Sequence, residues 1–297
     1  MAKEDCHRRI QEHSGHLPLS ALNVAAASSS PIGVFDSGVG GLSVLRALQA
    51  EMPQEHFVYV ADNGHAPYGE RDDAHVLKRS HAIADFLVAS HGIKALVVAC
   101  NTATAAAIHT LRAAYAELPI VGIEPALKPA AASSSSGVVG VMATRATLNS
   151  EKFARLLAAL QGSATFVLQP CDGLADAIER SDTVKTRALC AQYTQSMGEF
   201  GAAGGAMDTL VLGCTHYPFI AQELQALVGE QTALLEGGAP VARQTRRLLE
   251  KSGLAMEATT DQATKPIFYS TGNLGLLDSA IQRWLQMNAT TLALDLP

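Results

Sequence analysis

Short apolar runs alternate with longer stretches of helical character along this chain from Pro31 onward. Strands that are apolar throughout and alternate with helices are typical of a parallel sheet covered on both faces. The sequence therefore predicts an α/β protein. The expected strands are residues 32–35, 57–60, 95–99, 120–123, 138–142, 165–168, 209–212 and 267–269, and the expected helices include residues 41–51, 72–91, 104–116, 150–160, 183–200 and 241–251.

The chain is long enough for two domains, because its 297 residues exceed the ~100–200 residues of a typical single domain. A segment rich in Ala, Pro and Ser at residues 126–137 lies near the middle and predicts a boundary there, although an Ala-rich helix followed by a Ser-rich loop would have the same composition. Residues 1–30 combine a mixed-charge, His-rich start with a joint rich in Ala and Ser. We expect them to form a flexible extension.

The charge and the cysteine content of the chain indicate which kinds of molecule it binds and where it is located. The chain has 22 basic and 28 acidic residues, a net charge of −6, whereas a nucleic-acid-binding protein is normally basic. No apolar run approaches the ~20 residues that a membrane helix requires. The five cysteines are scattered and contain no C-x-x-C pair, which favours reduced thiols over a disulfide framework. We therefore expect a cytoplasmic protein that binds a small polar ligand, and neither nucleic acid nor a membrane.

Polar and reactive side chains follow the predicted strands at the points where these end. In open parallel sheets, ligands bind beyond the carboxyl ends of the strands, so these side chains are candidates for one site. They are Asp36 and Ser37 after the first strand, Asp62 after the second, Cys100, Asn101 and Thr102 after the third, Thr144 after the fifth, and Cys214, Thr215 and His216 after the strand near residue 210.

Cys100 and Cys214 have similar local sequences, since each follows an apolar strand and a small residue and precedes hydrogen-bonding groups. Each sulfur is expected near a helix N-terminus, whose partial positive charge favours the thiolate. One copy falls in each half of the chain, so two thiols would flank a ligand from opposite sides. Such a pair suits racemisation at an amino-acid Cα, with one thiolate as base and the opposing thiol as acid. His216 would assist Cys214, and Asp36 would assist Cys100.

Other interpretations of these residues stay open at this stage. A free Cys is often only a small buried hydrophobe. Cys100, Cys214 and His216 would also make a Cys₂His zinc set with water as the fourth ligand. The Gly38–Gly41 run does not complete the dinucleotide-binding pattern, because position 43 is Ser. Its glycines are expected to allow a tight turn and to expose amides to a ligand carboxylate. No Lys has a recognisable pyridoxal-phosphate setting, so we expect proton abstraction to be independent of a cofactor. Although the motif alone does not exclude zinc, we expect the site to hold no metal.

Five motifs together resemble the bacterial glutamate racemase family. They are FDSGVGGLSV at residues 35–44, PYG at 67–69, CNTATA at 100–105, IEPA at 123–126 and LGCTHYP at 212–218, in the family's order over about residues 31–290. The resemblance implies two similar parallel-sheet α/β domains, residues 31–124 plus about 236–297 and residues 125–235, with the active site in the cleft between them. It further implies interconversion of L- and D-glutamate, which supplies D-glutamate for peptidoglycan. We also expect a homodimer.

The resemblance also implies roles for individual residues. Cys100 and Cys214 are the expected catalytic acid–base groups, and Asp36 and His216 assist them. The expected substrate-binding residues are Asp36, Ser37, Pro67, Tyr68, Gly69, Asn101, Thr102, Thr144, Thr215 and His216.

The chain departs from the family pattern at residues 171–179, where Cys171-Asp172 stands in place of Cys-Pro. Glu179 is therefore either a catalytic partner of His216 or a solvated helix residue. An aspartate or hydantoin racemase would share the two-cysteine chemistry. A non-catalytic amino-acid binder would close two lobes around its ligand but would leave both cysteines without a role.

Overall fold

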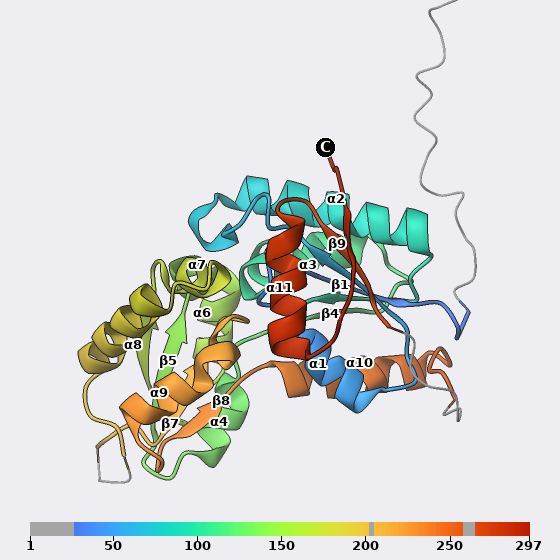
Figure 1. The fold of residues 1–297 in the computed structure, drawn as a ribbon. Helices are drawn as coiled ribbons and strands as arrows, with labels where there is room; N and C mark the ends of the chain where they lie inside the picture. Colours follow the sequence, from blue (N-terminus) through green and yellow to red (C-terminus); the bar gives the residue numbers. More distant parts are fainter. Residues whose placement is uncertain (1–26, 202–204, 258–264) are drawn as a thin grey trace, which may run out of the picture.

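The computed structural model describes residues 27–201, 205–257 and 265–297, which form two parallel β-sheets flanked by helices (Figure 1). Most of the predicted extension, residues 1–26, lies outside the described residues. Among the helices of the described part of the chain, none combines the length and apolar character needed to cross a membrane.

The first sheet has six strands, and every pairing in it is parallel. The strand order is β10-β9-β2-β1-β3-β4, so the last two strands of the chain complete a sheet begun by the first four. Its strands are β1 (Ile32–Asp36), β2 (Phe57–Ala61), β3 (Ala95–Val98), β4 (Ile120–Gly122), β9 (Ile267–Ser270) and β10 (Thr291–Ala293).

The second sheet has four strands in the order β6-β5-β7-β8, again all parallel. It consists of β5 (Val138–Ala143), β6 (Thr165–Pro170), β7 (Thr209–Leu212) and β8 (Ala233–Leu235). The predicted two-sheet parallel α/β architecture is confirmed. The strands β8 and β10 were not predicted, because each is a three-residue edge strand without a β-branched run.

Helices cover both faces of the first sheet, as the all-apolar strands require. Ile32 and Val34 of β1 face one core, which α1 (Leu42–Glu51), α10 (Gly238–Lys251) and α11 (Leu274–Leu285) complete. Phe35 of β1 and Val58 of β2 face the other core, which α2 (Asp73–His91) and α3 (Asn101–Ala114) complete. In Figure 1, α2 therefore lies above this sheet, and α1 and α10 lie below it.

The second sheet is covered in the same way by shorter helices. Val139 and Val141 of β5 pack with Leu127 and Phe153 on one face, while Met142 and Leu210 pack with Met197 on the other. The helices of this part are α4 (Leu127–Ser133), α5 (Arg145–Asn149), α6 (Glu151–Ala158), α7 (Leu174–Glu179), α8 (Thr183–Met197) and α9 (Ala221–Val228).

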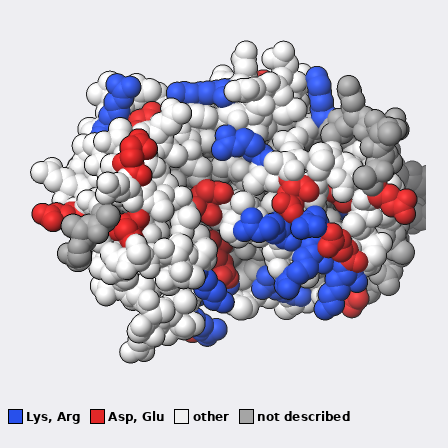
Figure 2. Space-filling model, turned by 90° about the horizontal axis from the view of Figure 1, so that it is seen from below, with Lys and Arg blue, Asp and Glu red and all other residues white. Residues whose placement is uncertain are grey.

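The chain passes from the first sheet to the second after β4 and returns with α10, which packs against α1, β3 and β4. The predicted domain limits near residues 124 and 236 fall in these two connections. Figure 2 shows basic side chains gathered over the underside of the first domain, where α1 and α10 lie. Arg246 on α10 is paired there with Glu51 and Glu250, so the basic face is partly neutralised.

The Ala- and Ser-rich segment at residues 126–137 is an ordered part of the second domain. It forms α4, followed by a loop in which Ser134, Ser135 and Ser136 all bind the carboxylate of Asp208. Of the two interpretations of this composition, an Ala-rich helix followed by a Ser-rich loop describes the structure.

Candidate active site

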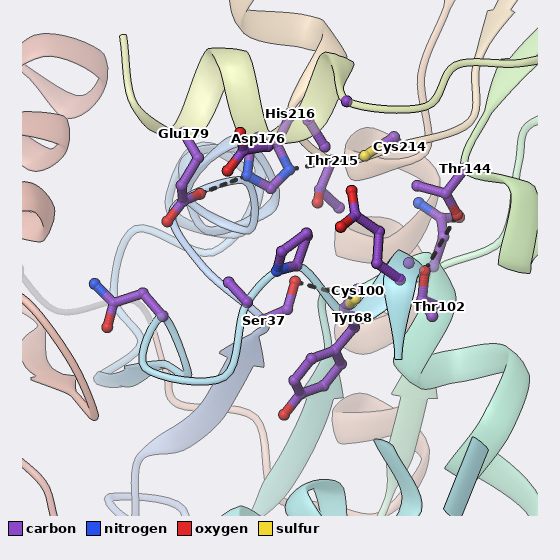
Figure 3. Close-up of a pocket in the computed structure, with 18 of the residues that line it drawn as sticks. Ser37, Tyr68, Cys100, Thr102, Thr144, Asp176, Glu179, Cys214, Thr215 and His216 are labelled. Atoms are coloured by element: carbon purple, nitrogen blue, oxygen red, sulfur yellow. Dashed lines mark hydrogen bonds and ion pairs between the residues drawn. The ribbon is translucent and has the colours of Figure 1, made fainter. Parts of the chain in front are cut away.

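A cavity of about 230 Å³ lies between the carboxyl ends of the two sheets (Figure 3). Every residue predicted for the site lines it except Asp36 and Asp62. Asp36 is fully buried and linked to the lining residues Ser37 and Thr215. The predicted residues that line it are Ser37, Pro67, Tyr68, Gly69, Cys100, Asn101, Thr102, Thr144, Glu179, Cys214, Thr215 and His216.

Cys100 lies between β3 and α3, and it caps the helix. Its sulfur accepts a hydrogen bond from the Ala103 amide at 3.5 Å, and its thiol lies 3.7 Å from the Ser37 hydroxyl. This cap explains why α3 begins at Asn101 and not at the predicted residue 104. Burial, and then the charge of Asp36, raise the pKa of the Cys100 thiol, against smaller opposing effects from Ala103 and Ser37. The helix N-terminus is present as predicted, but burial outweighs its effect on the pKa and favours the protonated thiol.

Cys214 follows β7 and precedes a short 3-10 helix, η3 (Tyr217–Ile220), where the N-terminus of a helix was expected beside the sulfur. The difference arises because the Tyr217 amide bonds back to the Cys214 carbonyl and Pro218 starts the tight turn. The Cys214 sulfur therefore caps no α-helix. Its polar neighbour is instead His216, whose Nδ1 lies 3.7 Å from the sulfur.

His216 joins Cys214 to Glu179. Its Nε2 lies 2.6 Å from Glu179 Oε2, and Figure 3 shows the two side chains pointing toward each other. Burial alone would lower the pKa of His216, but the hydrogen bonds to Cys214 and Glu179 and their charges raise it well above its usual value. The imidazole is thus held protonated beside the sulfur, where it stabilises negative charge. Glu179 is not a solvated helix residue, because its side chain is only 10% exposed.

Asp36 lies beneath the cavity at the end of β1. One of its carboxylate oxygens accepts a hydrogen bond from the Gly41 amide at 2.5 Å, and its other oxygen lies 3.5 Å from the Ser37 hydroxyl. Burial raises the pKa of Asp36 to about 6, although the charge of His216 opposes this. Since Ser37 also contacts Cys100, Asp36 is connected to that thiol through one hydroxyl.

Neutral hydrogen-bonding groups line the side of the cavity near α3 and α5. The Thr102 and Thr144 hydroxyls lie 3.3 Å apart, one from each domain, and Thr144 also caps α5. Asn101 is 6% exposed, and its Oδ1 has no hydrogen-bond partner within the described structure. An unpaired buried carbonyl is costly, so this atom is an acceptor available to a ligand.

Tyr68 presents its ring and backbone to the cavity, while its hydroxyl is directed elsewhere. That hydroxyl donates to Asp62 at 2.5 Å, and Asp62 also accepts hydrogen bonds from Arg79 and Thr271. Burial alone would raise the pKa of Asp62, but the bonds from Arg79 and Tyr68 lower it. Asp62, a polar residue at a strand end in the sequence, thus fixes the position of Tyr68 and does not line the cavity.

Several residues that line the cavity at its rim were not predicted. Four of them form two ion pairs within the second domain, Arg145 with Asp172 and Arg180 with Asp176. These residues lie on short helices and loops outside the recognised motifs, so no sequence pattern indicated that they line the cavity. Asn63 and Asn273 also line the cavity, from loops that follow β2 and β9.

The amides of the Gly38–Gly41 run are occupied by carboxylates of the protein itself. Val39 donates to Glu179 and Gly41 donates to Asp36, at 2.9 and 2.5 Å. The expectation that this turn offers its amides to a ligand carboxylate is therefore wrong for these two. The donors of the zinc alternative are also not arranged for it, since Cys100, Cys214 and His216 do not form a metal-binding group among the described residues.

Comparisons with known proteins agree with this geometry. The family model described as Asp/Glu/Hydantoin racemase matches residues 40–245. A glutamate racemase from Ralstonia pickettii is 48% identical over 249 residues, covering 83% of this chain and 85% of that protein. One from Pseudomonas aeruginosa is 47% identical over 247 residues, covering 82% and 90%.

Solved structures show the same similarity. A glutamate racemase from Bacillus anthracis superposes with a TM-score of 0.79 at 30% identity, covering 91% of this chain and 99% of that one. The Escherichia coli glutamate racemase, solved with L-glutamate and the activator UDP-MurNAc-ala, gives a TM-score of 0.75 at 30% identity and covers 90% and 99%. The resemblance indicated by the five motifs is confirmed, and the chain belongs to the Asp/Glu/hydantoin racemase family.

Proposed function

We propose that this chain is a glutamate racemase that interconverts L- and D-glutamate by proton transfer at Cα, with one cysteine on each face of the substrate. The observation that carries the proposal is the placement of Cys100 and Cys214 at the ends of β3 and β7, one from each sheet, on one cavity. The names of the similar proteins support glutamate as the substrate.

In the direction from L-glutamate, the Cys214 thiolate removes the α-proton. The Cα–H bond breaks, an S–H bond forms, and the electron pair stays on the substrate as a planar carbanion. Cys100 then gives its proton to the opposite face, which breaks its S–H bond and forms the Cα–H bond of D-glutamate. The environments suit these starting states, because burial keeps Cys100 protonated while His216 stabilises charge on Cys214. The reverse reaction exchanges the two roles.

Substrate binding relies on neutral groups. Asn101 Oδ1 accepts a hydrogen bond from the α-ammonium, and the hydroxyls of Ser37, Thr102, Thr144 and Thr215 donate to the carboxylates. The arginines among the described lining residues are Arg145 and Arg180, and both are exposed and paired with Asp side chains. Specificity for glutamate therefore depends on the geometry of fixed donors more than on net charge.

The cellular role follows from the product. D-glutamate made by this chain would enter peptidoglycan synthesis in the cytoplasm, and the enzyme would work as a homodimer without metal or organic cofactor. These statements rest on the likeness to glutamate racemases and on the two thiols that line the cavity as acid–base groups.

The decisive assay uses metal-free, cofactor-free protein with L-glutamate in D₂O. Circular dichroism should decay to zero, and early D-glutamate should be almost fully deuterated at Cα while unreacted L-glutamate stays protiated. L-aspartate and a hydantoin, supplied in parallel, should react far more slowly. Early product that retains the substrate's own proton would mean that one base serves both faces, and faster turnover of aspartate would replace the proposed substrate.

A further inference from the structure

The glycine loop (residues 38–41) of the first domain lies directly against the acid–base residues of the second. The Val39 amide donates to both carboxylate oxygens of Glu179, at 3.2 and 2.9 Å. A few residues further on, the Ser43 hydroxyl lies 2.8 Å from the Thr215 carbonyl and 2.8 Å from the Gly40 carbonyl, and its one proton is shared between these two acceptors. The contacts with Glu179 and Thr215 join segments 140 and 172 residues apart in the chain, and they cross the boundary between the two sheets.

Close approach, and not backbone conformation, accounts for glycine at positions 38 and 40. Neither residue is among the glycines in the left-handed region, so a side chain would cause no backbone strain there. A Cβ on Gly38 would lie 2.5 Å from both Glu179 oxygens. A Cβ on Gly40 would lie 2.6 Å from the Thr215 hydroxyl and 2.7 Å from His216 Cε1. The two glycines therefore leave the space that Glu179 and His216 occupy.

The two thiols differ in where their partners come from. Both hydrogen-bond partners of the Cys100 sulfur, Ser37 and the Ala103 amide, belong to the first domain, as does Asp36, whose charge acts on it more strongly than that of Cys214 across the cavity. Cys214 instead depends on His216, which depends on Glu179, which is held by Val39 of the other domain. Figure 3 shows this asymmetry, with the His216–Glu179 pair on the side of Cys214 and Ser37 on the side of Cys100.

We propose that the glycine loop is a positioning element that completes the acid–base group beside Cys214 only when the first domain is packed against the second. The proposal deepens the proposed function and rests on it. Contact between the domains then governs the proton transfers of Cys214, whereas the hydrogen-bond partners of Cys100 are already complete within one domain. Residues 38–41 and Ser43 are positioning residues, since they act through His216 and Glu179.

The charged and titratable groups that face His216 determine what a test can detect. Cys214 faces its Nδ1, Glu179 faces its Nε2, and Asp36 at the end of β1 acts on it through its charge. Asp176, one turn earlier on α7, is paired with Arg180. A displaced Glu179 therefore leaves His216 with less negative charge nearby, and His216 loses its proton at a lower pH.

The test is Gly38→Ala, with Gly33→Ala as the matched control. Both changes add one methyl group in or just after β1, but the methyl at position 33 meets Ile93 and Leu87 in the core and not the acid–base pair. Gly38→Ala should lower kcat about 10- to 100-fold, the range expected for loss of a charge-assisted hydrogen bond. It should also move the alkaline limb of the pH profile to lower pH. Gly33→Ala should alter stability without moving that limb.

A double-mutant cycle with Glu179→Gln separates positioning from general damage. When two residues act through the same group, the effects of their substitutions on kcat are not additive in free energy. In the Glu179→Gln background, Gly38→Ala should therefore cost little more. Losses that multiply would mean that the alanine disturbs the enzyme by another route, and they would overturn the proposal.

A readout without turnover distinguishes this proposal from the proposed function. The imidazole nitrogens of His216 can be titrated by ¹⁵N NMR and assigned by their loss in His216→Asn. Gly38→Ala should lower the pKa of His216 whether or not the wild-type chain racemises glutamate. A lowered value without racemase activity would refute only the function, whereas an unchanged titration would refute the positioning.

Ser43→Ala provides a second variant if Gly38→Ala does not fold. Its control is Ser80→Ala, another buried serine, whose hydroxyl donates at 2.7 Å to Val76 within α2. Ser43→Ala should lower kcat several-fold and should shift the His216 titration, because it frees the Thr215–His216 turn. Ser80→Ala should change only the melting temperature. Equal effects of the two serine variants on His216 would contradict the proposal.

Discussion

Replacing Glu179 by Gln tests the contact on which the Cys214 side of the site depends. Glu179 accepts hydrogen bonds from His216 at 2.6 Å and from the Val39 amide at 2.9 Å. Glutamine keeps the shape but has one acceptor oxygen in place of two and carries no charge. Both donors make their shorter bond to Oε2, so glutamine offers them either one uncharged oxygen or, with the amide turned over, an NH₂ group.

The size of the effect follows from the kind of bond that is lost. A hydrogen bond to a charged group contributes about 1.5–3 kcal/mol. If this energy stabilises the imidazolium while the adjacent sulfur gains or loses its proton, kcat falls about 10- to 150-fold at 1.36 kcal/mol per factor of ten. KM should change much less, because Glu179 is expected to act through His216 and not on the substrate.

The pH dependence gives a second signature with a defined sign. Hydrogen bonds and charges from Cys214 and Glu179 raise the pKa of His216 against the effect of burial. Without the Glu179 carboxylate the imidazolium loses its proton at lower pH, so the alkaline limb of kcat moves to lower pH. Initial rates by circular dichroism over pH 6–10, from either enantiomer, measure both the fall and the shift.

The control is Asp176→Asn on the same helix. Asp176 also lines the cavity, but its partner is Arg180, so this change should leave the alkaline limb in place. The reasoning fails if Glu179→Gln keeps the wild-type kcat and limb, or if Asp176→Asn shifts the limb equally. Thermal melts of both variants show whether a loss of rate comes from unfolding.

Three further predictions concern the thiols, the absence of a metal and the Ser-rich loop. Cys100→Ala and Cys214→Ala should each abolish racemisation in both directions, measured by circular dichroism, since every turnover needs a base on one face and an acid on the other. Exhaustive chelation, checked by elemental analysis, should leave activity intact; a loss that zinc restores would revive the Cys₂His site. Asp208→Asn should lower the free energy of unfolding in urea by about 2–3 kcal/mol, because its carboxylate accepts charge-assisted bonds from three serines. These bonds lower the pKa of Asp208 in the folded state, so its contribution is complete above its unfolded pKa of ~3.9 and is lost as the pH falls below it. An acid-unfolding midpoint that is the same in Asp208→Asn would contradict this.

The positions of the two cysteines could be predicted because parallel sheets impose them. The carboxyl ends of all strands in a parallel sheet lie at one edge, so residues that follow β3 and β7 must reach the same rim of their sheets. Apolar runs mark those strands in the sequence, and one small residue separates each strand from its cysteine, Ala99 before Cys100 and Gly213 before Cys214. No detail of side-chain packing enters this reasoning, which is why it succeeds.

Contacts between the domains could not be predicted in this way. The pairing of Glu179 with His216 depends on where α7 lies relative to β7 and the glycine loop, and residues 171–179 depart from the family pattern. The Ser-rich loop presents the same difficulty, since its partner Asp208 lies 72 to 74 residues away along the chain. Its composition alone is compatible with either a linker or an ordered loop. The hydrogen bonds to the Asp208 carboxylate, which the sequence does not reveal, order the loop.

The most consequential feature that the sequence did not reveal is the unequal surroundings of the two thiols. The sequences around the two cysteines look alike. In the structure, however, Cys100 is a buried thiol that caps α3, and Cys214 lies beside the His216 imidazole, whose pKa is raised. Enantiomers have equal free energies in water, so kcat/KM for the two directions of a racemase must be equal whatever surrounds each thiol. Unequal surroundings can therefore make kcat and KM differ between the two directions, but not their ratio. Such differences arise because each bound enantiomer and each protonation state is stabilised to a different degree. The different surroundings of Cys100 and Cys214 thus affect the enzyme-bound states, while the equilibrium between free L- and D-glutamate stays at equal amounts.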